Sequence, residues 1–393
     1  MMNFDQIINR RATNSAKWAV GPNELPLSIA DMDFPTAPAI VAALQAKVAT
    51  GVFGYETVPV AYYQAVADWY ANEHGCRPQI EWMQYASGVI PALASVIRRV
   101  TNPGDQILLQ APVYNMFFQT IRDNGRQVVS SDLNYDPTTQ SYSIDWGDLE
   151  TKLADQRTRL LILCNPHNPT GQIWSQADLI RLAELSGKYH VKIFADEIHG
   201  DITFNETGYV PFFSLPTSLL QQVIVAVSPS KTFNVASIHA ATLLIPNAGL
   251  RAVIQQGLQN DGLTAVNLAA IPATIAAYTQ GQAWLHELLA YLKTNRAWVE
   301  QLIATQLASQ IQVVPARATY LAWLDCRQVT RDTQPLAEFL RQTTGLILTP
   351  GAVYGEPGKA FLRLNLAYPR AVLEDGLARL VQGVAAYQEK SRN

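Results

Sequence analysis

Residues 160–171 read LLILCNPHNPTG, an apolar run that stops at a turn rich in asparagine and proline. Five consecutive apolar residues bounded by turn-forming residues predict a buried strand over 160–164. The polar side chains of residues 165–171 therefore follow the end of a strand. Taken alone, this segment is also explained as an ordinary turn, because Asn and Pro favour turns.

Two later segments repeat this arrangement. The run 191–195 precedes Asp-Glu-Ile-His at 196–199, and the run 223–227 precedes Ser-Pro-Ser-Lys at 228–231. Ligands of open α/β sheets collect outside the carboxyl ends of the strands, so we expect an amide, an acid and a lysine to converge there. Singly, the acid could cap a helix and the lysine could be solvated. The three segments in this order indicate a site.

Short β-branched or apolar runs recur through the middle of the chain and alternate with stretches of helical spacing. Further strands are predicted at 106–109, 128–130 and 242–245, and helices at 89–100, 114–124 and 176–189. Such alternation predicts an α/β fold with a mainly parallel sheet covered on both faces. We assign residues 46–280 to this large domain.

The rest of the chain predicts a smaller α+β domain. Apolar residues at helical spacing in 283–292 indicate a long amphipathic helix that bridges to it. The C-terminal small domain comprises residues 281–393, is joined by the N-terminal segment 1–45, and contains strands at 319–324 and 361–366 and a final helix over about 370–388. The weakly polar stretch Leu263–Tyr278 is too short for a bilayer and is expected to be a buried or subunit-contact helix.

Composition excludes several classes of protein. With 393 residues, 48% hydrophobic and 16% charged, the chain is expected to fold well. A net charge of −3 without a long basic run argues against nucleic-acid binding. Three widely spaced cysteines predict reduced core thiols. No signal peptide or membrane span is visible, so we expect a cytoplasmic protein and interpret the glycosylation pattern Asn205–Thr207 as a chance match.

Three other patterns point to different chemistry and fail. Ser228 and Lys231 fit the Ser-x-x-Lys pattern of penicillin-binding enzymes, but the companion motifs are absent. Gly358-Lys359 lacks the first glycine and the following Ser or Thr of a phosphate-binding loop. A metal cluster at 196–199 would need further ligands, and none stands at a suggestive spacing, so we expect no metal.

The residue types after the three strands meet the requirements of pyridoxal 5'-phosphate (PLP). This cofactor needs a lysine, a carboxylate at its ring nitrogen, a donor at its ring oxygen and an anion cradle for its phosphate. The chain offers a candidate for each. Ser87-Gly88-Val89 precedes a predicted helix, so its backbone N–H groups and the helix dipole can hold the phosphate, with help from the Ser228 hydroxyl.

The sequence resembles the fold-type-I PLP enzymes, close to the class I/II aminotransferases, and specifically the MalY/PatB branch of cystathionine β-lyase-like C–S lyases. Asn-Pro-x-Asn-Pro-Thr-Gly marks the superfamily, and Asp-Glu-Ile-His with Tyr-Leu-Ala-Trp-Leu-Asp marks the branch. The resemblance runs nearly end to end, and the segments that carry it are Ala30–Phe34, Gly51–Tyr55, Asn165–Gly171, Asp196–His199, Ser230–Asn234, Thr319–Asp325 and Arg363–Asn365.

The resemblance implies roles around the cofactor ring. Lys231 would bind the cofactor covalently and act as the general base. Asp196 would contact the pyridine nitrogen, and Asn168 the ring hydroxyl. Tyr114 would stack on the ring, and Ile198 would press on its opposite face.

The resemblance also implies how substrate and phosphate are held. Arg363 would bind the substrate carboxylate, with Tyr55 and Tyr114 also bordering the substrate. Tyr55 would reach the phosphate of the neighbouring subunit, which implies a homodimer with shared active sites. A surface ion pair is the alternative for Arg363, and Arg370 is its rival for the role.

Two positions depart from the aminotransferase pattern. His199 stands three residues after the cofactor aspartate, where aminotransferases carry tyrosine, and it favours a lyase. His239 stands eight residues after Lys231, where a second basic phosphate ligand is expected. Ser87, Ser228 and Tyr55 would then carry more of the phosphate affinity.

We therefore expect a PLP-dependent C–S β-lyase of methionine biosynthesis. It would cleave L-cystathionine and related cysteine S-conjugates to homocysteine or another thiol, pyruvate and ammonia. An aminotransferase acting on amino acids is the alternative, because fold alone does not separate the two. A transcriptional regulator built on this fold lacks support, since the sequence shows no additional basic helix-turn-helix domain.

Overall fold

The computed structural model describes residues 2–204 and 208–392, so the glycosylation pattern at Asn205–Thr207 lies outside the described residues. Its central element is a seven-stranded sheet in the order β2-β10-β9-β8-β7-β3-β4. The strands are β2 (Met83–Ala86), β3 (Gln106–Leu109), β4 (Gln127–Ser130), β7 (Thr158–Cys164), β8 (Lys192–Asp196), β9 (Val223–Val227) and β10 (Ala241–Leu244). Only β10 runs antiparallel to its neighbours β9 and β2, so the predicted mainly parallel α/β sheet is confirmed.

Strand β7 shows why these runs are apolar throughout. Leu161 and Leu163 pack into one core cluster, and Leu160 and Ile162 pack into another on the opposite face. Side chains alternate across a strand, so a strand buried on both faces needs apolar residues at every position.

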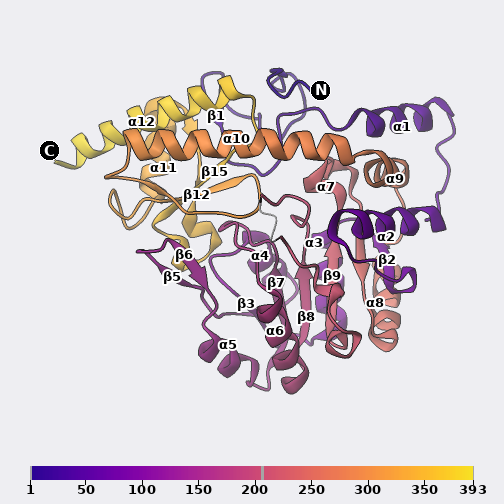
Figure 1. Ribbon diagram of the computed structural model, residues 1–393. Helices are drawn as coiled ribbons and strands as arrows, with labels where there is room; N and C mark the ends of the chain where they lie inside the picture. The colour runs from indigo at the N-terminus through magenta and orange to yellow at the C-terminus, as the bar shows by residue number, and fades with distance from the viewer. Residues whose placement is uncertain (1, 205–207, 393) are drawn as a thin grey trace.

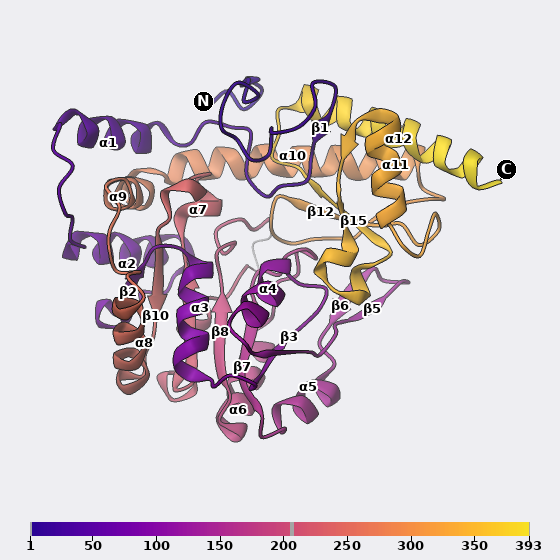
Figure 2. The ribbon, with the colours of Figure 1, turned by 180° about the vertical axis from the view of Figure 1, so that it is seen from behind.

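Helices cover both faces of this sheet. One face carries α3 (Val89–Val100), α4 (Asn115–Asp123) and α8 (Ala248–Asn260), which lie in front of the sheet in Figure 2. The other face carries α2 (Val60–His74), α5 (Trp146–Leu153), α6 (Gln176–Tyr189) and α9 (Ala270–Gln280), with α2 and α6 in front in Figure 1. The strand ends that carry the predicted site residues lie between these layers and the second sheet.

The second sheet has four strands in the order β11-β12-β15-β14. Its strands are β11 (Gln312–Val313), β12 (Leu321–Asp325), β14 (Thr349–Pro350) and β15 (Phe361–Asn365), and α11 (Gln334–Thr344) and α12 (Arg370–Arg392) pack beside it. The predicted strands 319–324 and 361–366 correspond to β12 and β15. Near this sheet β1 (Leu25–Pro26) pairs with β13 (Leu346–Ile347), which ties the N-terminal segment to the C-terminal part.

Helix α10 (Gln282–Gln306) is longer than the predicted segment 283–292 and runs across the molecule in Figure 1. Trp284 and Leu288 belong to the core cluster of the large sheet, whereas Val299 and Ile303 belong to the cluster of the second sheet. One continuous helix therefore contributes to both cores.

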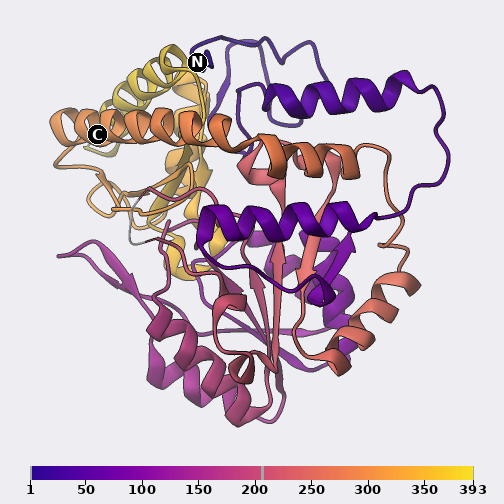
Figure 3. The same cartoon turned by 45° about the vertical axis from the view of Figure 1, so that its right-hand side comes forward.

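The stretch 263–278 contains a helix only from Ala270 onward. Asn267 Oδ1 accepts hydrogen bonds from the backbone N–H groups of Ala269 and Ala270 at 2.9 and 3.0 Å, which starts α9 there. Helix α9 lies between α1 (Pro38–Ala49) and α2, as Figure 3 shows, so it is a buried helix. None of the helices within the described residues is long and apolar enough to cross a membrane.

Candidate active site

A cavity of about 630 Å³ lies beyond the carboxyl ends of β7, β8 and β9. Nine of the predicted site residues line it: Gly88, Val89, Tyr114, Asn168, Asp196, Ile198, His199, Lys231 and Arg363. Most of them come shortly after strands of the large sheet, whereas Arg363 comes from β15 of the second sheet. The structure thus brings together residues as far apart in the chain as Gly88 and Arg363, which are 275 positions apart.

Lys231 lies in the one-turn helix α7 (Pro229–Thr232), directly after β9. Its Nζ donates a hydrogen bond to the carbonyl oxygen of Ala30 at 2.5 Å. Burial lowers the pKa of Lys231 to about 8; the charge of Arg363 adds to this effect, whereas Asp31 and Asp196 oppose it. The amine is therefore partly neutral near neutral pH, as a base requires.

Asp196 is the last residue of β8, and its Oδ1 accepts a hydrogen bond from the Ile198 N–H at 3.1 Å. Burial raises the pKa of Asp196 to about 6, against the opposing effect of Lys231. A cationic group placed beside this carboxylate would be stabilised, because it would compensate the buried negative charge.

Glu197 serves a different purpose from its neighbour. Its carboxylate accepts hydrogen bonds from the Tyr209 hydroxyl and from the Phe212 N–H, the latter at 3.0 Å. Burial raises the pKa of Glu197 to about 8. Glu197 therefore anchors the segment 209–212, away from the cavity lining.

His199 lines the cavity and is held neutral. Burial lowers its pKa to about 3, with further effects from the charges of Lys231 and Arg363. Among the described residues, its buried Nδ1 has no hydrogen-bond partner. The side chain therefore offers an uncharged polar edge next to the lysine.

Arg363 is buried and pointed at the cavity by two hydrogen bonds. Its Nη1 donates to Asn168 Oδ1 at 3.2 Å, and its Nη2 donates to the Ser28 carbonyl oxygen at 2.7 Å. The guanidinium also lies 5.0 Å from the centre of the Tyr354 ring. Asn168 Oδ1 accepts this hydrogen bond from Arg363, so the side-chain NH₂ group of Asn168 remains available as a donor.

Arg370 occupies a different place. It begins α12, and its guanidinium lies over the Trp298 ring at 4.8 Å, outside the cavity lining. This position does not support Arg370 as the rival of Arg363.

The predicted anion cradle differs in detail. The Ser87 N–H donates to the Leu263 carbonyl at 3.0 Å, and the Gly88 N–H donates to the Ala86 carbonyl at 2.9 Å. The N–H groups of Val89 and Ile90 open helix α3, where the first turn has no intrahelical acceptors. Of the predicted cradle, the Val89 N–H is therefore available as a donor, together with the Ile90 N–H.

Ser228, whose hydroxyl is predicted to help hold phosphate, does not line the cavity. Its Oγ donates to the Ala240 carbonyl at 2.6 Å and accepts from the Ser230 N–H at 3.1 Å, capping α7. Ser230 and His239 line the cavity in its place. Tyr55 lies outside the cavity lining and is fully exposed in the connection between α1 and α2.

Ala30, Tyr320 and Ile90 also belong to the site, although no role is predicted for them from the sequence. Ala30 lies in one of the segments that carry the family resemblance, which is the only signal in the sequence for its involvement. The Tyr320 hydroxyl donates to the same Ala30 carbonyl at 3.0 Å, and Ile90 lines the cavity. The carbonyl of Ala30 thus belongs to the immediate surroundings of the lysine.

A family model and two curated relatives show the family to which this chain belongs. The family model described as aminotransferase class I and II matches residues 22–380, so the chain belongs to this family. Among curated relatives, cystathionine beta-lyase PatB of Bacillus subtilis is 37% identical, covering 96% of this chain and 99% of PatB. Protein MalY of Escherichia coli is 32% identical, covering 98% of this chain and all of MalY. The predicted resemblance to the MalY/PatB branch is confirmed.

Solved structures agree with this assignment of fold. Cystalysin from Treponema denticola, which contains a pyridoxal 5'-phosphate cofactor, superposes with a TM-score of 0.92 at 27% identity, covering 98% of this chain and 99% of cystalysin. A PLP-bound putative aminotransferase from Clostridium difficile 630 gives a TM-score of 0.94 at 31% identity, covering 98% and 100%. The predicted fold-type-I architecture is therefore confirmed.

Proposed function

We propose that this protein is a PLP-dependent C–S β-lyase that cleaves L-cystathionine and related cysteine S-conjugates. The observation that carries the proposal is the convergence of Lys231, Asp196, Asn168 and Arg363 in one cavity. The names of the full-length relatives PatB and the cystathionine beta-lyase of Corynebacterium glutamicum, at 37% and 28% identity, support the same activity.

The residues present fit PLP. The free N–H groups at the start of α3 suit a phosphate, and the buried Asp196 carboxylate suits a protonated ring nitrogen. The NH₂ group of Asn168 can donate to a ring hydroxyl, and Tyr114 lines the cavity where a ring could stack. When bound, PLP supplies a cationic ring that withdraws electrons from the substrate Cα.

The chain's own groups then perform the reaction. Arg363 binds the substrate carboxylate, Lys231 holds the cofactor and takes the Cα proton, and Asp196 keeps the ring nitrogen protonated. Lys231 suits proton transfer because its pKa of about 8 lies close to neutral pH. The Cβ–S bond breaks, and sulfur leaves with the electron pair as a thiolate, which takes up a proton to give the thiol. The remaining three-carbon fragment is hydrolysed to pyruvate and ammonia.

His199 favours this reaction over amino transfer. Aminotransferases carry a tyrosine at this position, whereas here a neutral imidazole lies near Lys231 and Arg363. The alternative function is amino transfer, and it is supported by the membership of the chain in the aminotransferase class I and II family. A good β-leaving group takes up the electron pair released at Cα, so substrates that carry one should undergo cleavage in preference to amino transfer.

The test is incubation of the pure, cofactor-loaded protein with L-cystathionine, following pyruvate, ammonia and free thiol together. We expect the three products in equal amounts, and only slow half-transamination of L-alanine, which has no leaving group. Rapid turnover of L-alanine with a keto acid, and no thiol from cystathionine, would make the protein an aminotransferase.

We further propose a homodimer with shared active sites. Three apolar side chains in the connection after α1 are strongly exposed: Val52 at 70%, Phe53 at 66% and Tyr55 completely. Such clustered exposure suits a surface that a second copy covers. In that dimer Tyr55 reaches the phosphate of the neighbouring subunit.

The division into a segment 1–45, a large domain 46–280 and a small domain 281–393 is also a proposal. It is supported by the two main sheets, whose strands fall within 83–244 and 312–365. We also propose a role in methionine biosynthesis, because the proposed reaction would release homocysteine. A cytoplasmic location is proposed as well, supported by the free cysteines Cys76, Cys164 and Cys326.

A further inference from the structure

Residues 28–33, which we call the strap, run along one side of the cavity. Ser28, Ile29 and Ala30 line it directly. The Ala30 carbonyl accepts hydrogen bonds from both Lys231 Nζ, at 2.5 Å, and the Tyr320 hydroxyl, at 3.0 Å. The strap therefore supplies an acceptor for the lysine amine.

From the side of β15, Asn365 holds the strap. Its Nδ2 donates to the carbonyl oxygens of Ile29 and Asp31, both at 2.7 Å. The Asp31 N–H in turn donates to the Ile29 carbonyl at 3.0 Å. The backbone on either side of Ala30 is thereby fixed.

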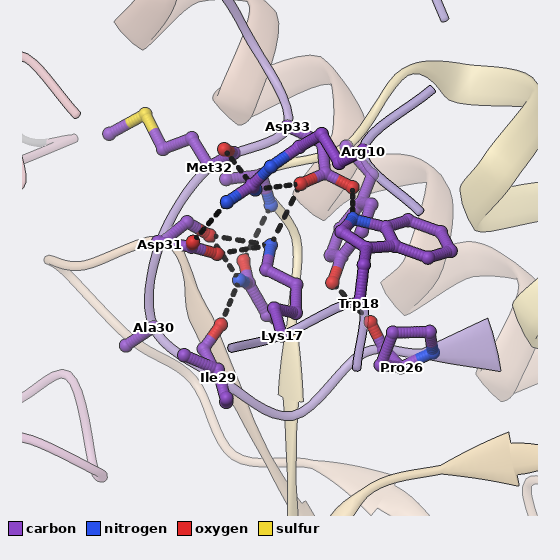
Figure 4. Close-up of polar contacts among 12 residues, drawn as sticks. Arg10, Lys17, Trp18, Pro26, Ile29, Ala30, Asp31, Met32 and Asp33 are labelled. Carbon is purple, nitrogen blue, oxygen red and sulfur yellow. Dashed lines mark hydrogen bonds and ion pairs between the residues drawn. The ribbon is translucent and has the colours of Figure 1, made fainter. Parts of the chain in front are cut away.

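A charged cluster from the N-terminal segment holds the strap from the other side (Figure 4). The Nζ of the fully buried Lys17 lies 2.5 Å from Asp31 Oδ1 and donates to the Asp31 carbonyl at 2.9 Å and to Asp33 Oδ1 at 3.2 Å. Arg10 pairs with Asp31 Oδ2 at 2.8 Å and also with Asp33. The Trp18 indole N–H donates to Asp33 Oδ2 at 2.9 Å.

This cluster constrains the Ala30 carbonyl through covalent geometry. The Ala30 carbonyl and the Asp31 N–H belong to one planar peptide unit, so a fixed Asp31 fixes the direction of the carbonyl. Two carboxylates face two cations here, and removing one partner of a buried pair leaves an uncompensated charge. Asp31 therefore has one favoured position, and the carbonyl group of Ala30 has one favoured direction.

We propose that Lys17 and Asp31 are a positioning pair that aims the Ala30 carbonyl at Lys231 and so places the lysine amine whenever it is not bonded to the cofactor. Neither side chain touches the reacting atoms. The inference rests on the proposed function, in which Lys231 is the cofactor lysine and the base.

The two partners have opposite electrostatic effects on Lys231. The Asp31 charge raises the pKa of the lysine, and the Lys17 charge lowers it. The other charged groups that act on Lys231 are Arg363 and Asp196, and the neutral His199 also lines the same cavity. Loss of Asp31 should therefore lower the pKa of the lysine, and loss of Lys17 should raise it.

The experiment compares Asp31→Asn and Lys17→Met with the wild-type holoenzyme. We expect kcat for thiol release to fall at least about tenfold in both variants, since misplacing a reacting group by about 1 Å costs up to about 100-fold, with KM nearly unchanged. The pH midpoint of kcat, which reports the free lysine acting as the base, should move down in Asp31→Asn and up in Lys17→Met. The opposite shifts are a signature that a loss of stability alone would not produce.

Arg341→Met is the matched control. Its guanidinium pairs with Glu24 at 2.6 Å, so it also ties the N-terminal segment to the C-terminal part, but it does not touch the strap. We expect this variant to keep the wild-type kcat and pH midpoint even if its melting temperature falls.

Three outcomes would overturn the inference. In the first, both strap variants melt earlier but keep kcat and the pH midpoint. In the second, the two midpoints move in the same direction. In the third, Arg341→Met loses as much kcat as the strap variants. If Lys17→Met fails to fold, the isosteric Asp31→Asn decides alone, through its kcat and downward shift. A wild-type protein that does not link PLP to Lys231 would instead refute the proposed function.

Discussion

Replacing Arg363 by lysine should weaken catalysis while leaving the cofactor in place. Arg363 donates one N–H of Nη1 to Asn168 Oδ1 at 3.2 Å and one N–H of Nη2 to the Ser28 carbonyl oxygen at 2.7 Å. A second N–H on each nitrogen remains for the two oxygens of a carboxylate. Lysine carries a single ammonium and cannot reproduce this planar pair of donors.

The magnitude follows from these contacts. A hydrogen bond to a charged group contributes about 1.5–3 kcal/mol, and the lysine keeps at most one of the two to the substrate. With the loss of the aiming contacts to Asn168 and Ser28, transition-state stabilisation should fall by about 2–4 kcal/mol. This corresponds to a decrease in kcat/KM of about 30- to 1,000-fold.

The assay is pyruvate release from L-cystathionine by Arg363→Lys, together with the absorbance of the bound cofactor, which should be unchanged. Arg370→Lys is the matched control, because Arg370 lies over Trp298 outside the cavity lining. Unchanged kinetics in Arg363→Lys, or an equal loss found only in Arg370→Lys, would refute the assignment of the carboxylate site.

Borohydride should fix the cofactor on the Lys231 peptide, as read by mass spectrometry, and label on another lysine would reject Lys231. Sedimentation should show a dimer, and a fully active monomer would argue against a shared site at Tyr55. Burial raises the pKa of Glu197 to about 8, above its ordinary value of 4.5, so its folded state holds a proton that its unfolded state has lost. The free energy of unfolding should therefore fall as pH rises from about 4.5 to 8. Glu197→Gln should flatten this slope in urea titrations, and an unchanged slope would contradict it.

The central part of the site could be predicted because it depends on local patterns. Asn168, Asp196 and Lys231 each follow an apolar run, and the three runs are the adjacent parallel strands β7, β8 and β9. Parallel neighbours end at the same sheet edge, so sequence order alone places the three side chains together. Arg363 has no such pattern and was found only through the family resemblance.

The details that the sequence missed depend on competition for hydrogen bonds. Ser228 precedes a proline, and a serine before proline at the first helical position is the signature of a helix cap. That signal could have shown that its hydroxyl caps α7. The pairing of Lys17 with Asp31 and Asp33 joins two irregular segments, which leave no periodic trace in a sequence.

The contacts of the strap join residues that lie far apart in the chain. Ala30 leaves the ribosome 201 residues before Lys231 and 290 residues before Tyr320, both of which donate to its carbonyl. Asn365, which donates a hydrogen bond to the Ile29 carbonyl oxygen, follows 336 residues after Ile29. Contacts that close such long stretches of chain form late in folding, because the chain loses the entropy of loop closure before the contact can stabilise it. A chain that ends before β15 therefore contains Lys231 but lacks Arg363 and Asn365, and so lacks part of the site.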